Sequence, residues 1–242
     1  MRRDVENCSF AAPRPSCRML QTETMNYSRQ NPSPRYQQLV GMYRDMHLRG
    51  ERGNPAAKTF DGRSLAPQAP RIKRAIERSG SRSILDYGSG KGMQYDATSF
   101  SLPGQGEWDS VLDYWGVEEV VCFDPAYPPY TRVPQGQFDG VIATDVLEHC
   151  PEEDMEWIVA EMFGFAARFV YATIACYPAA RRLPNGENAH CTIRRPEWWD
   201  ELLRRTSTHH PGVEWEVWLQ DGSPVRGVPI GELRLASWAE AG

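Results

Sequence analysis

The stretch Ser81–Gly92, SRSILDYGSGKG, decides the fold of this chain. Its apolar pair Ile84–Leu85 ends at Asp86, and a glycine-rich turn follows at once. A short apolar run that ends in an acid and glycines is typical of a buried parallel strand whose carboxyl end faces a ligand. Glycines at alternate positions allow a tight turn and let the backbone approach that ligand closely. The turn is neither a P-loop nor a G-x-G-x-x-G turn, because its third glycine comes one residue early.

Similar apolar runs recur along the chain, and amphipathic patterns with a 3.6-residue period separate them. The expected strands lie within 81–89, 118–126, 137–145, 168–178, 213–220 and 230–237. The expected helices cover 33–47, 69–78, 151–167 and 194–205. This alternation predicts an α/β fold with a Rossmann-like, doubly wound and mainly parallel sheet. The last two strands predict an antiparallel C-terminal edge, and the early helices an N-terminal helical decoration.

Residues 1–30 lack periodicity and are expected to form a flexible N-terminal arm. Residues 31–242 are expected to form one domain, with N-terminal helices over 31–80 as a cap and the Rossmann-like core over 81–242. Only 13 residues, PAYPPYTRVPQGQ, separate Asp124 from Phe138. Proline fits neither a central strand nor a crossover helix, so the third strand of such a sheet is expected to be reduced or missing.

Charge and hydropathy limit the class of protein. The 242 residues include 27 Lys plus Arg and 32 Asp plus Glu, a net charge of −5, which excludes a strong single-sign field for general nucleic-acid or membrane binding. No apolar run approaches about 20 residues, and the N-terminus lacks the apolar core of a signal peptide. We therefore expect a cytoplasmic protein that does not bind membranes.

The six cysteines form no C-x-x-C pair and are expected to be reduced thiols. The spacing of His149, Cys150, His190 and Cys191 fits no zinc-ligand pattern, so no metal site is predicted.

Two further strand ends carry polar groups. Asp124 ends the second strand, where an acid can accept bonds from both hydroxyls of a ribose. The stretch FDGVIATDVLEH, residues 138–149, brings Asp145, Glu148 and His149 to the edge of the sheet, where they are candidates for ligand contact or proton transfer.

Together these features resemble the class I S-adenosylmethionine-dependent methyltransferases, over about residues 81–205. LDYGSGKG is similar to the family's first motif, Asp124 falls at its ribose-binding acid, and FDGVIATDVLEH is similar to the segment found in members that methylate small molecules. NAHCTI, residues 188–193, followed by PEWW resembles the element after the fifth strand that faces the substrate.

The resemblance implies S-adenosylmethionine as cofactor and methyl transfer to the oxygen or nitrogen of a small metabolite. This metabolite would be anionic if the arginines between 181 and 205 face the cofactor cleft, and otherwise these arginines form a solvated face. The residues implied for cofactor binding are Asp86, Tyr87, Gly88, Ser89, Gly90, Gly92, Asp124, Pro125, Thr144, Asp145 and Val146. The candidates for catalysis, by residue type and position, are His149, His190 and Asp145. The candidates for substrate contact are Tyr43, His47, Tyr177, Asn188 and Arg181. Tyr127 or Tyr130 is a candidate for stacking on adenine.

Other readings stay open at this point. Asp124–Tyr127 is a near match to a motif of nucleic-acid amino-methyltransferases, and six arginines between 181 and 205 would suit either an anionic metabolite or a phosphate track. A glycine turn and a strand-end acid also occur in nicotinamide-dependent oxidoreductases, where the VLEH segment has no role. A catalytically silent cofactor-binding or scaffold protein, and a homodimer, are further alternatives.

Overall fold

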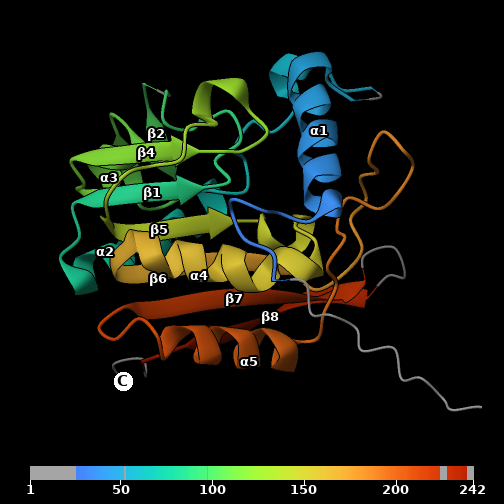
Figure 1. Cartoon of the computed structure of the whole chain (residues 1–242). Helices are drawn as coiled ribbons and strands as arrows, with labels where there is room; N and C mark the ends of the chain where they lie inside the picture. The colour runs from blue at the N-terminus through green and yellow to red at the C-terminus, as the bar shows by residue number, and fades with distance from the viewer. Residues whose placement is uncertain (1–25, 52, 97, 224–227, 239–242) are drawn as a thin grey trace, which may run out of the picture.

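The computed structural model describes residues 26–51, 53–96, 98–223 and 228–238. They form a six-stranded sheet in the order β4-β1-β5-β6-β7-β8, and a separate two-stranded sheet. All neighbours in the large sheet are parallel except β8, which runs antiparallel to β7 (Figure 1). The strands of the large sheet are β1 (Ser83–Tyr87), β4 (Glu119–Phe123), β5 (Phe138–Thr144), β6 (Ala166–Ala175), β7 (Glu214–Ser223) and β8 (Val228–Ala236).

This arrangement confirms the predicted Rossmann-like α/β fold with an antiparallel C-terminal edge. The missing third strand is confirmed too, because residues 125–137 contribute only the 3-10 turn Pro128–Tyr130. The strand β4 is therefore the edge of the sheet. Proline removes backbone donors and fixes the backbone torsion, which explains why this segment forms turns.

Helices cover both faces of the sheet. Two of them, α4 (Met155–Phe165) and α5 (Pro196–Ser207), pack on one face, where Trp199 and Trp215 are buried. The other face is covered by α2 (Ala69–Ser79) and α3 (Val111–Trp115). None of the helices in the described ranges combines the length and hydropathy needed to cross a membrane.

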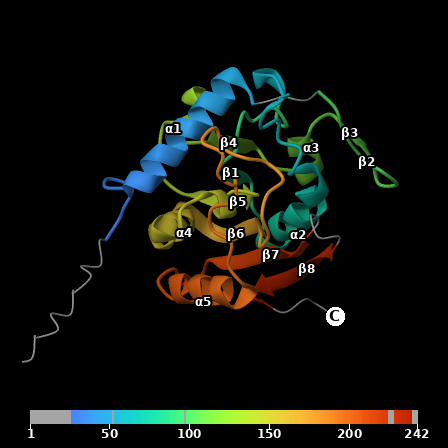
Figure 2. The same ribbon diagram turned by 90° about the vertical axis from the view of Figure 1, so that its right-hand side faces the viewer.

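The first helix, α1 (Pro34–Arg49), crosses the carboxyl ends of the strands (Figure 2). Ser33 begins it as N-cap, since its hydroxyl accepts from the amide of Tyr36. The buried Asp154, just before α4, accepts from the backbone amide of Ser33 at 3.0 Å. This anchor fixes α1 across the sheet edge.

Two details differ from the sequence prediction. Within the insertion between Tyr95 and Trp115, a small antiparallel pair forms from β2 (Phe100–Leu102) and β3 (Gly106–Trp108), which the sequence pattern did not indicate. The helix expected over 151–167 begins with a 3-10 turn and ends at Phe165, and β6 already starts at Ala166. The alanines at this boundary suit either element, so pattern alone places it poorly.

Residues 1–25 of the predicted arm lie outside the described residues. The end of the predicted arm is packed against the domain, because Arg29 donates to Glu161 of α4 and, at 2.8 Å, to the Tyr87 hydroxyl of β1. Its guanidinium also lies over the ring of Trp157, 4.7 Å from the centroid. The boundary of the arm at residue 30 is therefore too late.

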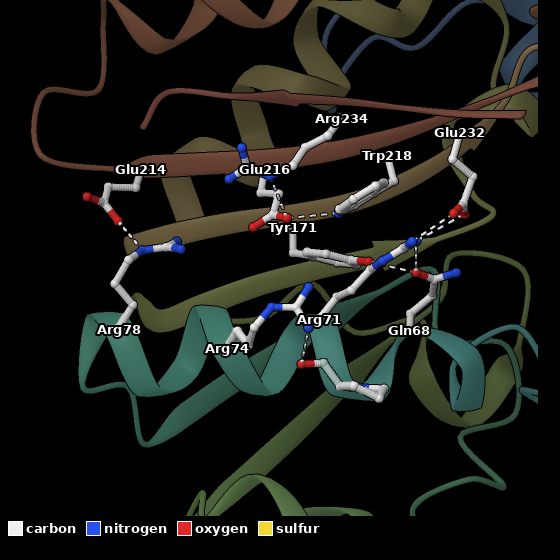
Figure 3. Close-up of polar contacts among 11 residues, drawn as sticks. Gln68, Arg71, Arg74, Arg78, Tyr171, Glu214, Glu216, Trp218, Glu232 and Arg234 are labelled. Atoms are coloured by element: carbon white, nitrogen blue, oxygen red, sulfur yellow. Dashed lines mark hydrogen bonds and ion pairs between the residues drawn. The ribbon is translucent and has the colours of Figure 1, made fainter. Parts of the chain in front are cut away.

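A network of charged and aromatic side chains ties α2 to the β7–β8 hairpin (Figure 3). Arg71 of α2 pairs with Glu232 of β8 at 2.7 Å and stacks on Trp218 of β7. Glu216, 5% exposed, accepts from Trp218 and Arg234. We call this set the α2–hairpin network; its members are Gln68, Arg71, Arg78, Tyr171, Glu214, Glu216, Trp218, Glu232 and Arg234.

Candidate functional site

A pocket opens at the carboxyl edge of the parallel strands, beneath α1. The pocket has a volume of about 1010 Å³, including its open mouth. The turn after β1, the end of β4 and the end of β5 form its floor, and α1 together with residues 60–64 forms its wall. Ligands bind at this edge in open α/β sheets, so the pocket is where the sequence placed the site.

The turn after β1 is held in a shape that requires glycine. Gly88 has φ 82°, and a Cβ there would lie 2.6 Å from a methyl carbon of Val146. Gly90 has φ 60°, and its amide donates to Asp124 at 3.0 Å. The amide of Gly88 donates to the carbonyl of Phe123. The turn is therefore pressed against both neighbouring strand ends, and its backbone faces the pocket.

Asp86 is the buried acid of this turn, at 2% exposure. Its Oδ2 accepts from the Tyr95 hydroxyl at 2.8 Å and from the Gln94 amide at 3.1 Å. Burial raises the pKa of Asp86 to about 7, and the nearby Asp124 adds to the rise. A cationic ligand beside it would stabilise the charged form.

Asp124 acts first as a brace. Its Oδ1 accepts from the amides of Ala126 and Tyr127, and its Oδ2 accepts from Gly90. Burial raises its pKa to about 6, while these three backbone bonds lower it. A carboxylate has about four acceptor positions, so Asp124 has capacity for one further donor. It could accept from one ribose hydroxyl, not from both as the sequence suggested.

Several buried polar atoms around the pocket lack a hydrogen-bond partner among the described residues: His47 Nδ1, Ser89 Oγ and Gln94 Oε1. His47 packs between Phe60 and Tyr127, with ring centroids 4.5 Å and 5.1 Å away, and burial lowers its pKa to about 4. An unsatisfied buried polar group costs free energy, and such groups gather where a ligand or ordered water completes them.

Asp145 stands at the end of β5 with φ 56°, a left-handed conformation rare outside glycine. Its amide donates to Thr173, and the Thr173 hydroxyl donates to its Oδ1 at 3.0 Å. Burial raises the pKa of Asp145. Strained residues of this kind cluster at functional sites. Among the three predicted catalytic residues, Asp145 therefore lies in the pocket wall and has a raised pKa, which makes it a stronger base than an ordinary carboxylate.

His149 also lines the pocket, but its Nδ1 is engaged. It lies 2.9 Å from the carbonyl of Ala189 and 2.7 Å from the Tyr43 hydroxyl. Burial lowers the pKa of His149 to about 3, so the ring stays neutral and is a weak base at neutral pH. His190 packs edge-on against it, with centroids 4.8 Å apart, and burial lowers the pKa of His190 as well.

Glu148, between these groups, is fully buried. Its Oε1 accepts from the amide of Ala175, and its Oε2 has no partner in the described part of the chain. Burial and the nearby Asp145 raise the pKa of Glu148 to about 8. One ligand atom each from Glu148, His149 and His190 lies within 4.8 Å of the others, so these side chains could hold a cation. The cysteines nearby suit this less, because burial raises the pKa of Cys191 to about 11.

The structure brings most of the predicted residues into the pocket wall. They are Tyr43, His47, Asp86, Tyr87, Gly88, Ser89, Gly90, Asp124, Pro125, Thr144, Asp145, Val146 and His149. Tyr87 lines it with its hydroxyl engaged elsewhere, on Arg29 and Glu161.

Other predicted residues are not part of the pocket wall. Gly92 packs on Cys122, Tyr177 donates to Gln220, and Asn188 bonds both backbone groups of Ala179. Neither Tyr127 nor Tyr130 lines the pocket, since Tyr127 stacks on His47. His190 lies outside the wall, packs against the wall residue His149 and interacts electrostatically with Asp145. Side-chain length and loop path decide these placements, and neither can be read from spacing.

Of the two interpretations of the arginine segment, the pocket wall favours a solvated face over contacts to an anionic substrate, and Arg181 is not part of that wall. None of the six arginines from Arg181 to Arg205 lines the pocket. Arg181 pairs with Glu51, Arg194 with Glu152, and Arg205 with Glu156. These side chains act as surface ion pairs, so nothing on the described surface of this segment favours a phosphate track.

Several wall residues were not among the predicted site residues, and those outside α1 and the strand ends include Phe60, Gly62, Ser64 and Gln94. The first three lie in a segment without periodicity, where no residue pattern signals a ligand site. Gln94 follows the glycine turn by two residues, and that proximity was the only available signal. No family model, curated protein or solved structure matches this chain.

Proposed function

We propose that this protein transfers a methyl group from S-adenosylmethionine to a small molecule. The observation that carries the proposal is the pocket at the carboxyl edge, which joins the glycine turn after β1, the acid after β4 and the β5 end. These are the positions that the resemblance to class I methyltransferases assigns to the cofactor.

The wall of the pocket suits the parts of such a cofactor. The two hydrogen bonds to Asp86 both end on Oδ2, so Oδ1 is the oxygen for the ammonium group of the methionine part. The turn's backbone allows close approach, and Asp124 has one acceptor position for the ribose. Unpartnered His47 Nδ1 and Gln94 Oε1 are further contacts for polar groups of the ligand.

The acceptor belongs at the side of the pocket formed by Tyr43, Asp145 and His149. Methyl transfer needs the acceptor atom in line with the sulfonium carbon and water excluded. Asp145 is the base for an acceptor that starts protonated, because its raised pKa makes it a stronger proton acceptor than His149.

The test is calorimetric titration with S-adenosylmethionine and S-adenosylhomocysteine. We expect saturable binding by the wild type, weakened at least about tenfold in Asp86→Asn, because a charge-assisted bond to the ammonium group is lost. The matched control is Asp96→Asn, an exposed acid two residues beyond Gln94. Release of S-adenosylhomocysteine with a panel of hydroxylated and amino metabolites then tests transfer.

Failure of the folded wild type to bind either ligand would overturn the proposal. Binding without transfer to any acceptor would favour a cofactor-binding scaffold. A nucleic-acid acceptor would show as methylated RNA or DNA and a strongly salt-dependent affinity.

A further inference from the structure

A cluster of metal-ligating side chains lies beside the pocket, built from two segments far apart in sequence. Glu148 and His149 belong to a 3-10 turn after β5, and His190 belongs to the loop between β6 and α5. Backbone bonds hold the segments together: the amides of Cys191 and Thr192 both donate to the carbonyl of Glu148. The cluster is therefore a fixed part of the fold.

Both imidazoles are oriented by backbone carbonyls. His149 Nδ1 lies 2.9 Å from the carbonyl of Ala189, and His190 Nδ1 lies 2.6 Å from the carbonyl of Tyr177. A carbonyl only accepts, and the Tyr43 hydroxyl, 2.7 Å from His149 Nδ1, donates to the same Ala189 carbonyl, so the Nδ1 atoms carry the protons in this arrangement. The lone pair is then on Nε2 of each ring. Metal-binding histidines are typically held in this way.

Glu148 adds a buried acceptor to the cluster. Its Oε2 has no hydrogen-bond partner in the described residues, while Oε1 is bonded to Ala175. A proton on Glu148 could be donated to one of the two Nε2 atoms and would leave the other lone pair without a donor from this carboxyl. One cation would be bound by all three acceptors at once, whereas a proton on Glu148 could not interact with all of them. This difference favours a cation site over a protonated acid.

We propose that Glu148, His149 and His190 bind one divalent first-row transition-metal ion. Imidazole suits Fe²⁺, Co²⁺ and Zn²⁺ better than Mg²⁺ or Ca²⁺, and two imidazoles with one carboxylate leave coordination positions open. Ligand atoms around such an ion stand about 3–4 Å apart, so their present spread of up to 4.8 Å closes by about an ångström on binding.

The position gives the ion a role that rests on the proposed function. His149 belongs both to this cluster and to the acceptor side of the pocket, so an ion held by the cluster would lie next to the acceptor. The ion would lower the pKa of a bound hydroxyl group, and Asp145 would accept the proton that this hydroxyl loses. An O–CH3 bond then forms as the S–CH3 bond breaks, and S-adenosylhomocysteine leaves. The substrate class is thus a hydroxylated small molecule, methylated on oxygen.

The test is titration of tag-free protein with Co²⁺, followed by calorimetry and by its visible absorption bands, with Zn²⁺ as competitor. We expect one site per chain, with the Co²⁺ affinity reduced at least about tenfold in both Glu148→Gln and His190→Gln. His209→Gln, which alters an exposed histidine outside the cluster, is the control and keeps the affinity. Absence of thiolate-to-cobalt absorption in the near ultraviolet excludes Cys150 and Cys191 as ligands.

The proposal is overturned if Co²⁺, Fe²⁺ and Zn²⁺ show no saturable binding, or if their affinity is unchanged in His190→Gln. His190 is only half-buried, so this variant decides even if Glu148→Gln fails to fold by circular dichroism. Titration with S-adenosylhomocysteine in the absence of metal separates the two proposals. If the protein binds the cofactor but no metal, only the proposed metal site is overturned. If it binds metal but not the cofactor, the proposed methyltransferase function is overturned.

Discussion

Two polar clusters lie on the same sheet and differ in how completely their charges are paired. In the α2–hairpin network, buried Glu216 accepts from two donors, and Arg71 and Arg78 each have a carboxylate partner (Figure 3). At the carboxyl edge, Glu148 Oε2, His47 Nδ1 and Gln94 Oε1 have no partner in the described residues.

The difference separates two uses of buried charge. A satisfied network fixes two elements against one another, so removing a partner lowers stability and leaves ligand binding intact. An unsatisfied cluster is held in place by the fold at a cost in free energy, and a ligand repays that cost. Changes there are expected to alter binding and activity more than stability.

The largest effect on stability is expected from the paired cluster. Glu216→Ala removes the acceptor of Trp218 and the buried partner of Arg234, so we expect the free energy of unfolding to fall by about 3 kcal/mol. Urea denaturation measures it. Glu216→Gln keeps an acceptor and should lose less, and a change in S-adenosylhomocysteine affinity in either variant would break the distinction between the two clusters.

The next effect concerns pH and Asp86. The pKa of Asp86 in the folded state, about 7, lies above its ordinary value of 3.8. Between about pH 4 and 7 the folded state therefore keeps a proton on Asp86 that the unfolded state has already released. The stability contributed by this proton is present below about pH 4 and is lost as pH rises through 7. We expect the wild type to lose more than about 1 kcal/mol relative to Asp86→Asn between pH 5 and 8.

Other groups with shifted pKa values, such as His47, also contribute to the pH dependence of the free energy of unfolding. Subtracting the values measured for Asp86→Asn removes these contributions from the comparison. Cofactor affinity should move in the opposite direction, increasing with pH across the same range, because the ammonium group needs the ionised carboxylate. Parallel stability curves for the two proteins would contradict the burial of an acid at this position.

A smaller gain in stability is expected at Asp145. Asn tolerates the left-handed conformation better than Asp and needs no burial of charge, so Asp145→Asn should raise the free energy of unfolding by about 0.5–1 kcal/mol. Methyl transfer should fall at the same time. Asp139→Asn is the contrast, since Asp139 accepts from two backbone amides and Arg168, which lower its pKa. That variant should lose stability.

The smallest effect is expected on the arginine segment. Arg194→Ala and Arg205→Ala each remove a half-exposed ion pair, so each should change the free energy of unfolding by less than about 0.5 kcal/mol. The KM for an acceptor should not change either. A severalfold rise in KM in either variant would show that these arginines contact the substrate.

The sequence was informative where structure is decided locally. The strand ending at Asp86, the glycine turn and the end of β5 could be predicted because hydrophobic period and glycine placement act over a few residues. The missing third strand could be predicted for the same reason, from proline between 125 and 137. The antiparallel β7–β8 edge followed from two polar–apolar alternations around a Gly/Pro-rich connection.

Features that depend on distant contacts could not be predicted. Phe60 lines the pocket only because its loop folds beneath α1, and the pairing of Glu148 with His190 depends on backbone bonds from Cys191 and Thr192. Whether the arginines between 181 and 205 contact a substrate could not be decided from the sequence, because residue type shows a charge but not the partner that neutralises it. Asp124 matched its expected place, yet its bonds to Gly90, Ala126 and Tyr127 give it a bracing role.

The most direct test is amide hydrogen exchange of the wild-type protein with and without S-adenosylhomocysteine. We expect added protection over residues 86–92, 123–127 and 144–149, and unchanged exchange in α2 and in the described parts of β7 and β8. Unchanged exchange at the glycine turn, or protection centred on the α2–hairpin network, would contradict the claim that the carboxyl-edge pocket is the cofactor site.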